Sequence, residues 1–173
     1  MKVTLVLGGA RSGKSEFAEA RIEELPAPWT YVATAQAFDD EMQARIEAHQ
    51  GRRGEDWQTC EAPILLPEAV REASADCPLL VDCLTLWLSN LMLGDHDVAS
   101  ASDELEAALV ARKAPTVLVS NEVGLSIVPD TPLGRRFRDQ QGILNKRIAK
   151  RADCVYFLAA GLPITLKSPK AEQ

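Results

Sequence analysis

The chain has 173 residues, of which 46% are hydrophobic and 25% charged, a balance that fits a globular protein and excludes a disordered or fibrous one. This length predicts one domain spanning residues 1–173. The net charge of −6 argues against general nucleic-acid binding, and without a signal-peptide pattern or an apolar run of membrane-spanning length we expect a cytoplasmic protein with no membrane span.

Apolar runs rich in β-branched residues alternate with helical patterns along the chain. The runs predict strands at residues 2–7, 29–33, 78–82, 116–120 and 154–159. Helical patterns pass through Ala18, Ile22 and Leu25, then recur at about 84–93, 101–112 and 133–151. A last run, ITLK after Gly161-Leu162-Pro163, predicts an antiparallel edge strand. The alternation predicts an α/β fold, a mostly parallel sheet with helices on both faces and a short antiparallel edge near the C-terminus.

Two polar stretches interrupt this alternation, at residues 34–62 and 121–134. Each follows a predicted strand and therefore opens at the carboxyl edge of the sheet, where ligands bind in open α/β folds. Within the first stretch, Asp39 is a predicted cap for a short helix over residues 40–49, and Gly51 is its predicted stop.

The sequence GGARSGKS at residues 8–15 fits the phosphate-binding motif GxxxxGK[ST] at every fixed position. A predicted strand precedes it and a predicted helix follows it, which is the context that the motif requires. In such a loop the backbone N–H groups and the helix N-terminus face phosphate oxygens. We expect Lys14 to contact the terminal phosphates of a nucleoside triphosphate and the Ser15 hydroxyl to bind Mg²⁺. The loop comprises Gly8, Gly9, Ala10, Arg11, Ser12, Gly13, Lys14 and Ser15.

Asp82 ends the predicted strand PLLVD and has two interpretations. Its carboxylate is placed to act on the metal or the nucleotide, or it caps the helix that follows. The sequence argues against a switch GTPase, because the only Asn-Lys pair, Asn145-Lys146, continues as Arg147-Ile148 inside a predicted helix rather than as NKxD. A helicase or strand-exchange motor would need a larger core and a basic groove.

His49 also has two interpretations. Its helical spacing from Met42 and Ile46 is typical of a histidine that faces the core. It also stands immediately before QGRRG, whose two arginines, at positions 52 and 53, are suited to bind phosphate oxygens. The other histidine, His96, is expected on the surface, in the acidic turn GDHDV.

The chain has four cysteines, Cys60, Cys77, Cys83 and Cys154. They form no CxxC pair, so we expect buried or partly buried free thiols rather than a zinc site.

Six segments together resemble the bifunctional adenosylcobinamide kinase/adenosylcobinamide-phosphate guanylyltransferase family of cobalamin biosynthesis. They are GGARSGKS, YVATAQAFDDEMQARIEAHQGRR, the Trp and Glu of DWQTCEAP, LLVDCLTLWLSNLM, VLVSNEVGLSIVP and RRFRDQQGILNKRIAKRADCVYFLAAGLPITLK. They cover nearly the whole chain in order. The patterns DDEMxxRIxxH and NEVGxxIVP are far more specific than the phosphate loop.

The resemblance implies a P-loop NTPase fold of the RecA-like group and two reactions. Family members phosphorylate adenosylcobinamide and then transfer GMP from GTP to adenosylcobinamide phosphate, giving adenosylcobinamide-GDP and pyrophosphate. The transfer passes through a guanylylated histidine, which corresponds to His49. The resemblance also implies GTP or ATP as substrates and a homotrimer. The implied nucleotide contacts are residues 8–15, Ala33, Thr34, Ala35, Gln50, Gly51, Arg52, Arg53, Glu61 and Asp82.

Two other functions remain open on the sequence. One is a plain phosphate-loop kinase of another small metabolite, in which His49 is merely packed. The other is a non-enzymatic scaffold that senses GTP or ATP. Within NEVG, Glu122 either orients a substrate hydroxyl or forms a structural turn.

Overall fold

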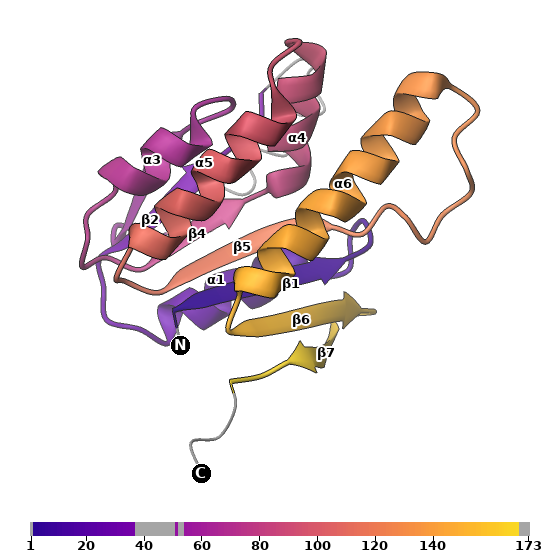
Figure 1. Cartoon of the computed structure of the whole chain (residues 1–173). Helices are drawn as coiled ribbons and strands as arrows, with labels where there is room; N and C mark the ends of the chain where they lie inside the picture. The colour runs from indigo at the N-terminus through magenta and orange to yellow at the C-terminus, as the bar shows by residue number, and fades with distance from the viewer. Residues whose placement is uncertain (1, 37–50, 52–53, 170–173) are drawn as a thin grey trace.

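Seven strands form one sheet in the order β3-β2-β4-β5-β1-β6-β7 (Figure 1). The computed structural model describes residues 2–36, 51 and 54–169, so the helix predicted at 40–49 lies outside the described residues. The strands are β1 (Val3–Gly8), β2 (Trp29–Ala33), β3 (Trp57–Glu61), β4 (Leu79–Asp82), β5 (Thr116–Asn121), β6 (Cys154–Ala159) and β7 (Leu162–Lys167). Every neighbouring pair is parallel except β6 and β7, which confirms the predicted mostly parallel sheet with an antiparallel edge.

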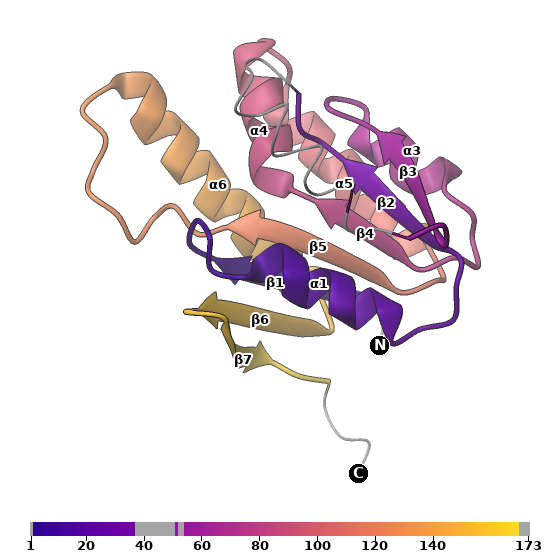
Figure 2. The ribbon, with the colours of Figure 1, turned by 180° about the vertical axis from the view of Figure 1, so that it is seen from behind.

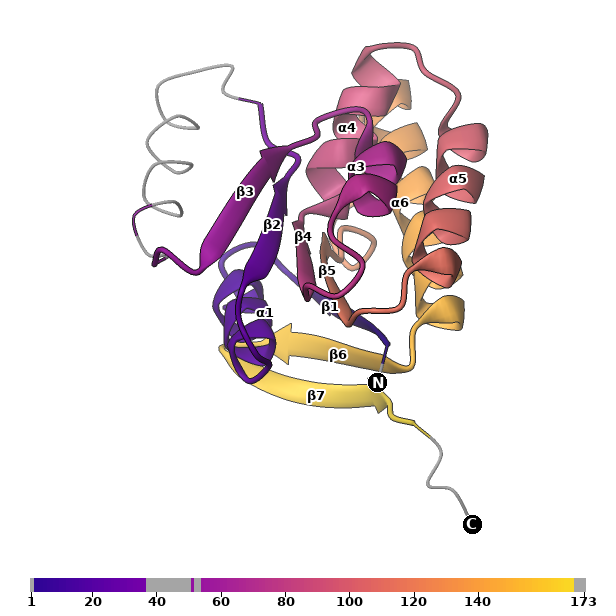
Figure 3. The same ribbon diagram turned by 90° about the vertical axis from the view of Figure 1, so that its left-hand side faces the viewer.

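Helices cover both faces of this sheet, as predicted. They are α1 (Lys14–Glu23), α3 (Leu66–Glu72), α4 (Leu84–Leu93), α5 (Val98–Ala111) and α6 (Pro132–Arg151). In the side view of Figure 3, α1 lies on one face and α3, α4, α5 and α6 lie on the other. β1 is buried along its whole length because side chains from both layers pack on it, which explains its continuous apolar sequence.

Each face has its own core. On the helix-rich face, Trp87, Leu105 and Leu118 are fully buried in one large cluster. On the opposite face, Ile22 of α1 packs among side chains of β1, β4 and β5 such as Val6. The two clusters fix the sheet between its helical layers. Because β1 to β6 are parallel, their carboxyl ends form one edge, at which the phosphate loop lies (Figures 1 and 2).

Two elements differ from the sequence-based expectation. Residues 57–61, expected to lie in a polar excursion, form the edge strand β3. Only Trp57 is buried in that strand, because β3 has one neighbour and its remaining side chains face solvent. The short helix α3 was not predicted, and Pro67 stands in its first turn.

Two further findings concern polar and reactive side chains. Cys60 on β3 is exposed rather than buried or partly buried, since it lies on the solvent side of an edge strand. His96 is exposed, as expected.

No helix among the described residues combines the length and apolar character needed to cross a membrane.

Candidate nucleotide site

The phosphate loop connects the end of β1 to the start of α1 at the carboxyl edge of the sheet. Gly13 is the N-cap of α1 and has a left-handed backbone (φ 88°), which glycine adopts without strain. A Cβ on Gly8 would lie 2.5 Å from the Leu158 carbonyl oxygen, so only glycine fits where the loop leaves the sheet. Arg11, at the exposed tip, also has a positive φ of 55°. This strand, loop and helix are the predicted context for the motif.

Lys14 is buried and its ammonium points back into the loop. The Nζ atom donates hydrogen bonds to the Gly9 carbonyl oxygen and to Ser12 Oγ, the latter at 3.4 Å. Burial lowers the Lys14 pKa, and the nearby Cys83 and Asp82 oppose that shift. A cation held within this loop, at the start of α1, is suited to contact the phosphates of a nucleotide.

Three predicted contact residues lie in one row across the sheet. Ala33 on β2 pairs in register with Glu61 on β3 and with Asp82 on β4, all at the carboxyl ends of their strands. Asp82 is half-buried, and the N-cap of α4 is Cys83, with no side-chain capping bond. The alternative interpretation of Asp82 as a helix cap is therefore wrong.

The Asp82 carboxylate and the Ser15 hydroxyl are oxygen donors of the kind that Mg²⁺ prefers. The described residues contain no group of three or more His, Cys, Asp or Glu side chains that would cage a metal. This donor set nevertheless fits Mg²⁺ at a nucleotide, where substrate phosphates and water supply the other ligands.

The Thr34 side chain is fully buried and holds the start of α4. Its hydroxyl donates to the Cys83 carbonyl oxygen at 2.7 Å and accepts from the Cys83 N–H at 2.8 Å. From α4, Asn90 donates to the carbonyl oxygens of Thr34 (2.8 Å) and Pro63 (2.9 Å). Burial, with Asp82 beside it, raises the pKa of the Cys83 thiol to about 12, so this thiol stays protonated. Asn90 thus ties together the chain segments that follow β2 and β3.

A second buried network holds the end of β5. The Asn121 N–H donates to Thr85 Oγ1 at 2.8 Å, and its carbonyl accepts from Asn145 Nδ2 at 3.0 Å. Ser120 and Gln141 complete the network through the Asn145 side-chain oxygen. Asn145 therefore lies inside α6 as a structural side chain, as expected from the absence of an NKxD motif.

The residues after β5 brace the phosphate loop. The Glu122 N–H donates to the Gly8 carbonyl oxygen at 3.0 Å, while the Glu122 carboxylate accepts from the Gly124 N–H at 2.7 Å. The carboxylate thus forms the structural turn that was one of the two interpretations of NEVG. On the other side of the loop, the Gly161 N–H of the β6–β7 turn donates to the Ser12 carbonyl oxygen at 3.1 Å.

The structure brings together one part of the predicted site. The phosphate loop, Ala33, Thr34, Ala35, Glu61 and Asp82 all lie at the carboxyl edge. Gly51 is exposed. His49, Gln50, Arg52 and Arg53 lie outside the described residues, so their predicted roles stay predictions.

Sequence reasoning missed Asn90, Gln141 and the role of Asn145. Each is a buried polar side chain on the inward face of a helix. The available signal was a polar residue within an otherwise apolar helical face, as in Gln141-Leu144-Asn145-Ile148.

Comparison with known proteins gives a consistent result. Residues 4–166 match the family model described as cobinamide kinase / cobinamide phosphate guanyltransferase. The chain is 48% identical to the bifunctional adenosylcobalamin biosynthesis protein CobP of Pseudomonas aeruginosa, over 94% of this chain and 96% of that protein. It is 38% identical to the bifunctional adenosylcobalamin biosynthesis protein CobU of Salmonella typhimurium, over 94% of this chain and 98% of that protein.

Solved structures show a shared fold at low sequence identity. A Pyrococcus horikoshii OT3 protein aligns with a TM-score of 0.60 at 9% identity, covering 98% of this chain and 87% of its own. An ATPase of a type III secretion system of pathogenic bacteria aligns with a TM-score of 0.52 at 10% identity, covering 95% of this chain and 56% of its own. These similarities confirm the P-loop NTPase fold.

Proposed function

The chain belongs to the cobinamide kinase / cobinamide phosphate guanyltransferase family, and we propose how its residues divide the two reactions of that family. It is a bifunctional enzyme of cobalamin biosynthesis, with cobinamide kinase and cobinamide-phosphate guanylyltransferase activities and a nucleotide substrate. The observation that carries this conclusion is the family match over residues 4–166, which includes the folded phosphate loop.

In the kinase reaction, the hydroxyl of the aminopropanol arm of adenosylcobinamide attacks the γ-phosphorus of GTP or ATP. The bond between that phosphorus and the β-phosphate oxygen breaks, the nucleoside diphosphate leaves, and the hydroxyl proton passes to solvent water. The loop N–H groups and the Lys14 ammonium hold the phosphates and neutralise the developing charge. Bound Mg²⁺, held by Ser15 and Asp82, would supply further charge neutralisation.

In the guanylyl transfer, a neutral imidazole nitrogen of His49 attacks the α-phosphorus of GTP. Pyrophosphate leaves, and a phosphorus–nitrogen bond joins GMP to His49. A phosphate oxygen of adenosylcobinamide phosphate then attacks the same phosphorus, and the phosphorus–nitrogen bond breaks to give adenosylcobinamide-GDP. Splitting the transfer into two displacements lets the enzyme bind the triphosphate and the bulky corrinoid in turn. The family resemblance of DDEMxxRIxxH supports this role for His49.

The remaining nucleotide contacts follow from the same proposal. Arg52 and Arg53, together with Gln50 and Gly51, which precede them in the sequence, bind the nucleotide, the two arginines through phosphate oxygens. Ala33, Thr34, Ala35, Glu61 and Asp82 contact the nucleotide along the carboxyl edge. The Thr34 hydroxyl pairs with the Cys83 backbone, and the Thr34 carbonyl oxygen accepts from Asn90, so the buried Thr34 holds the segment that carries Ala33 and Ala35. The proposal includes a cytoplasmic homotrimer in which residues 39–60 help line clefts between subunits.

Labelling with GTP that carries ³²P on the α-phosphate tests the His49 assignment. We expect label on the protein that is labile to acid and stable to alkali, and no label on His49→Ala. His49→Ala should keep some kinase activity, since that reaction needs only the held triphosphate and the substrate hydroxyl. Absence of label on the parent would favour a plain kinase. A sensing scaffold would make no corrinoid nucleotide and release no pyrophosphate.

A further inference from the structure

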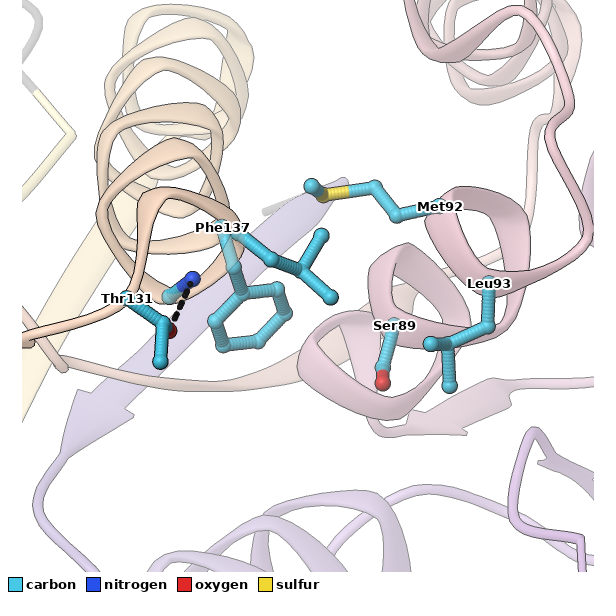
Figure 4. A pocket seen from close by; sticks show the side chains of 7 residues that line it. Ser89, Met92, Leu93, Thr131 and Phe137 are labelled. Atoms are coloured by element: carbon cyan, nitrogen blue, oxygen red, sulfur yellow. Dashed lines mark hydrogen bonds between the residues drawn. The ribbon is translucent and has the colours of Figure 1, made fainter.

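A cavity of about 290 Å³ lies between the end of α4 and the first turns of α6 (Figure 4). Its walls are mainly apolar. α4 contributes Ser89, Met92 and Leu93, and the start of α6 contributes Thr131, Leu133 and Phe137. In Figure 4, Met92 extends from α4 toward the Phe137 side of the cavity. The Thr131 hydroxyl caps α6 by accepting from the Gly134 N–H at 3.1 Å.

The loop that leads to this cavity is apolar and exposed. Between β5 and α6, Leu125 is 81% exposed, Ile127 is 91% exposed and Val128 is 60% exposed. On the cavity rim, Leu93 and Leu133 are also more than half exposed. Exposed apolar side chains that gather in one place in this way are typical of a binding surface.

The exposed loop of this surface starts beside the phosphate loop. The exposed loop begins at Glu122, whose N–H donates to the Gly8 carbonyl oxygen. Figures 1 and 2 show the first half of α6, with the loop before it, extending beyond the carboxyl edge on which the phosphate loop lies, while α4 rises from the sheet beside it. The cavity and the phosphate loop are thus joined by the segment between β5 and α6.

We propose that this cavity and residues 125–128 form the docking surface for the corrin ring of adenosylcobinamide. The inference rests on the proposed function and locates the acceptor substrate of that same site. The corrin ring is a large macrocycle with many methyl groups, and the reactive hydroxyl is on an arm outside the ring. The ring must therefore bind beside the phosphate loop rather than in it, on an apolar surface of this kind.

The size and shape of the cavity agree with this ligand. Small-molecule pockets typically measure about 300–1,000 Å³, so a cavity of about 290 Å³ takes an edge of the ring. The exposed loop then covers part of a ring face. The Ser89 hydroxyl, in the cavity wall, is placed to bond an amide of the ring periphery.

The test uses single variants of the full chain that spare its core. Leu93→Ser and Leu133→Ser each remove apolar contact at exposed positions, and Ser89→Phe fills the cavity. We expect each to raise the KM for adenosylcobinamide in the kinase reaction by about tenfold or more, with kcat and nucleotide affinity close to those of the parent. Equilibrium dialysis, in which bound adenosylcobinamide is measured by its visible absorbance, should show the same loss of affinity. Val110→Ser, at a 58% exposed position on α5, is the matched control and should leave both values unchanged.

The outcomes separate this inference from the proposed function. If the parent turns over the corrinoid and all three variants keep the KM and dissociation constant of the parent, the docking surface is overturned. A fall in the mass measured by light scattering, with unchanged corrinoid affinity, would identify the surface as a subunit interface and would also overturn it. If the parent binds the corrinoid without turning it over, and the variants bind it more weakly, the docking surface is supported and the proposed function is contradicted.

Discussion

At the scale of single residues, Lys14 combines a functional position with an energetic cost. Its ammonium is buried in the loop, and burial lowers its pKa below the usual value of 10.5. The folded protein therefore disfavours the charged form that a phosphate site requires. Active sites commonly hold such locally unfavourable groups, because their benefit appears only with substrate.

We expect Lys14→Met to abolish both activities without lowering the thermal midpoint of the free protein, because the variant removes a buried charge. The sign of the pH dependence follows from the lowered pKa. Just below pH 10.5 the unfolded chain binds the Lys14 proton more than the folded chain does, so the free energy of unfolding rises with pH in that window. The raised pKa of Cys83 has the opposite effect above the usual thiol pKa of 9.0, and it acts in both proteins. The Lys14 effect is therefore read as a difference: between pH 8 and pH 10.5, the free energy of urea unfolding of the parent should rise relative to that of Lys14→Met. A parent curve that falls relative to the variant would contradict the assigned direction.

At the scale of elements, α4 fixes the strand ends that carry the site. Thr85 bonds the end of β5, and Asn90 bonds the carbonyl groups of Thr34 and Pro63, which follow β2 and β3. Trp87, between them, donates its indole N–H to the Ile64 carbonyl oxygen at 2.8 Å. One helix thus sets the relative positions of three strands at the carboxyl edge. We infer that Asn90 is a positioning residue for the nucleotide contacts.

Asn90→Ala leaves two carbonyl groups without their donor, which costs about 1–3 kcal/mol for each one that stays buried. We also expect weaker nucleotide binding, measured by calorimetry at a temperature where the variant is fully folded. The control is Ser102→Ala on α5, which removes a buried hydroxyl bonded to the Val98 carbonyl. It should lower stability and leave nucleotide affinity unchanged. Equal affinity in Asn90→Ala and the parent would show that Asn90 only stabilises the fold.

The elements also show how far the sequence predicts this fold. Strands buried on both faces, such as β1 and β4, have continuous apolar runs and are predicted nearly to the residue. The helix expected at 84–93 is α4. β3 was missed because four of its five residues are exposed and carry no apolar pattern. The phosphate loop was predicted from local spacing, whereas the bonds of Asn90 depend on contacts between residues distant in sequence, which spacing does not encode.

At the scale of the whole molecule, the phosphate loop is tied to distant parts of the chain. Glu122, after β5, bonds its first residue, and Gly161, in the β6–β7 turn, bonds Ser12. β1 lies between β5 and β6, so these contacts come from the strands on either side of it. The loop therefore keeps its shape only while both neighbours are paired with β1. Nucleotide binding should accordingly depend on the folded sheet as a whole.

A ligand that binds only the folded state stabilises it by about 2.7 kcal/mol at a concentration one hundred times its dissociation constant. For a chain of this length, that corresponds to an increase in thermal midpoint of roughly 5–10 °C. We expect this increase with GTP and Mg²⁺ in both the parent and His49→Ala, because His49 acts in chemistry after the phosphates are held. Lys14→Met should lose most of the increase, and chelation of Mg²⁺ should reduce it in the parent. Scanning calorimetry measures all four cases, and an equal shift in Lys14→Met and the parent would mean that GTP binds elsewhere than at the loop.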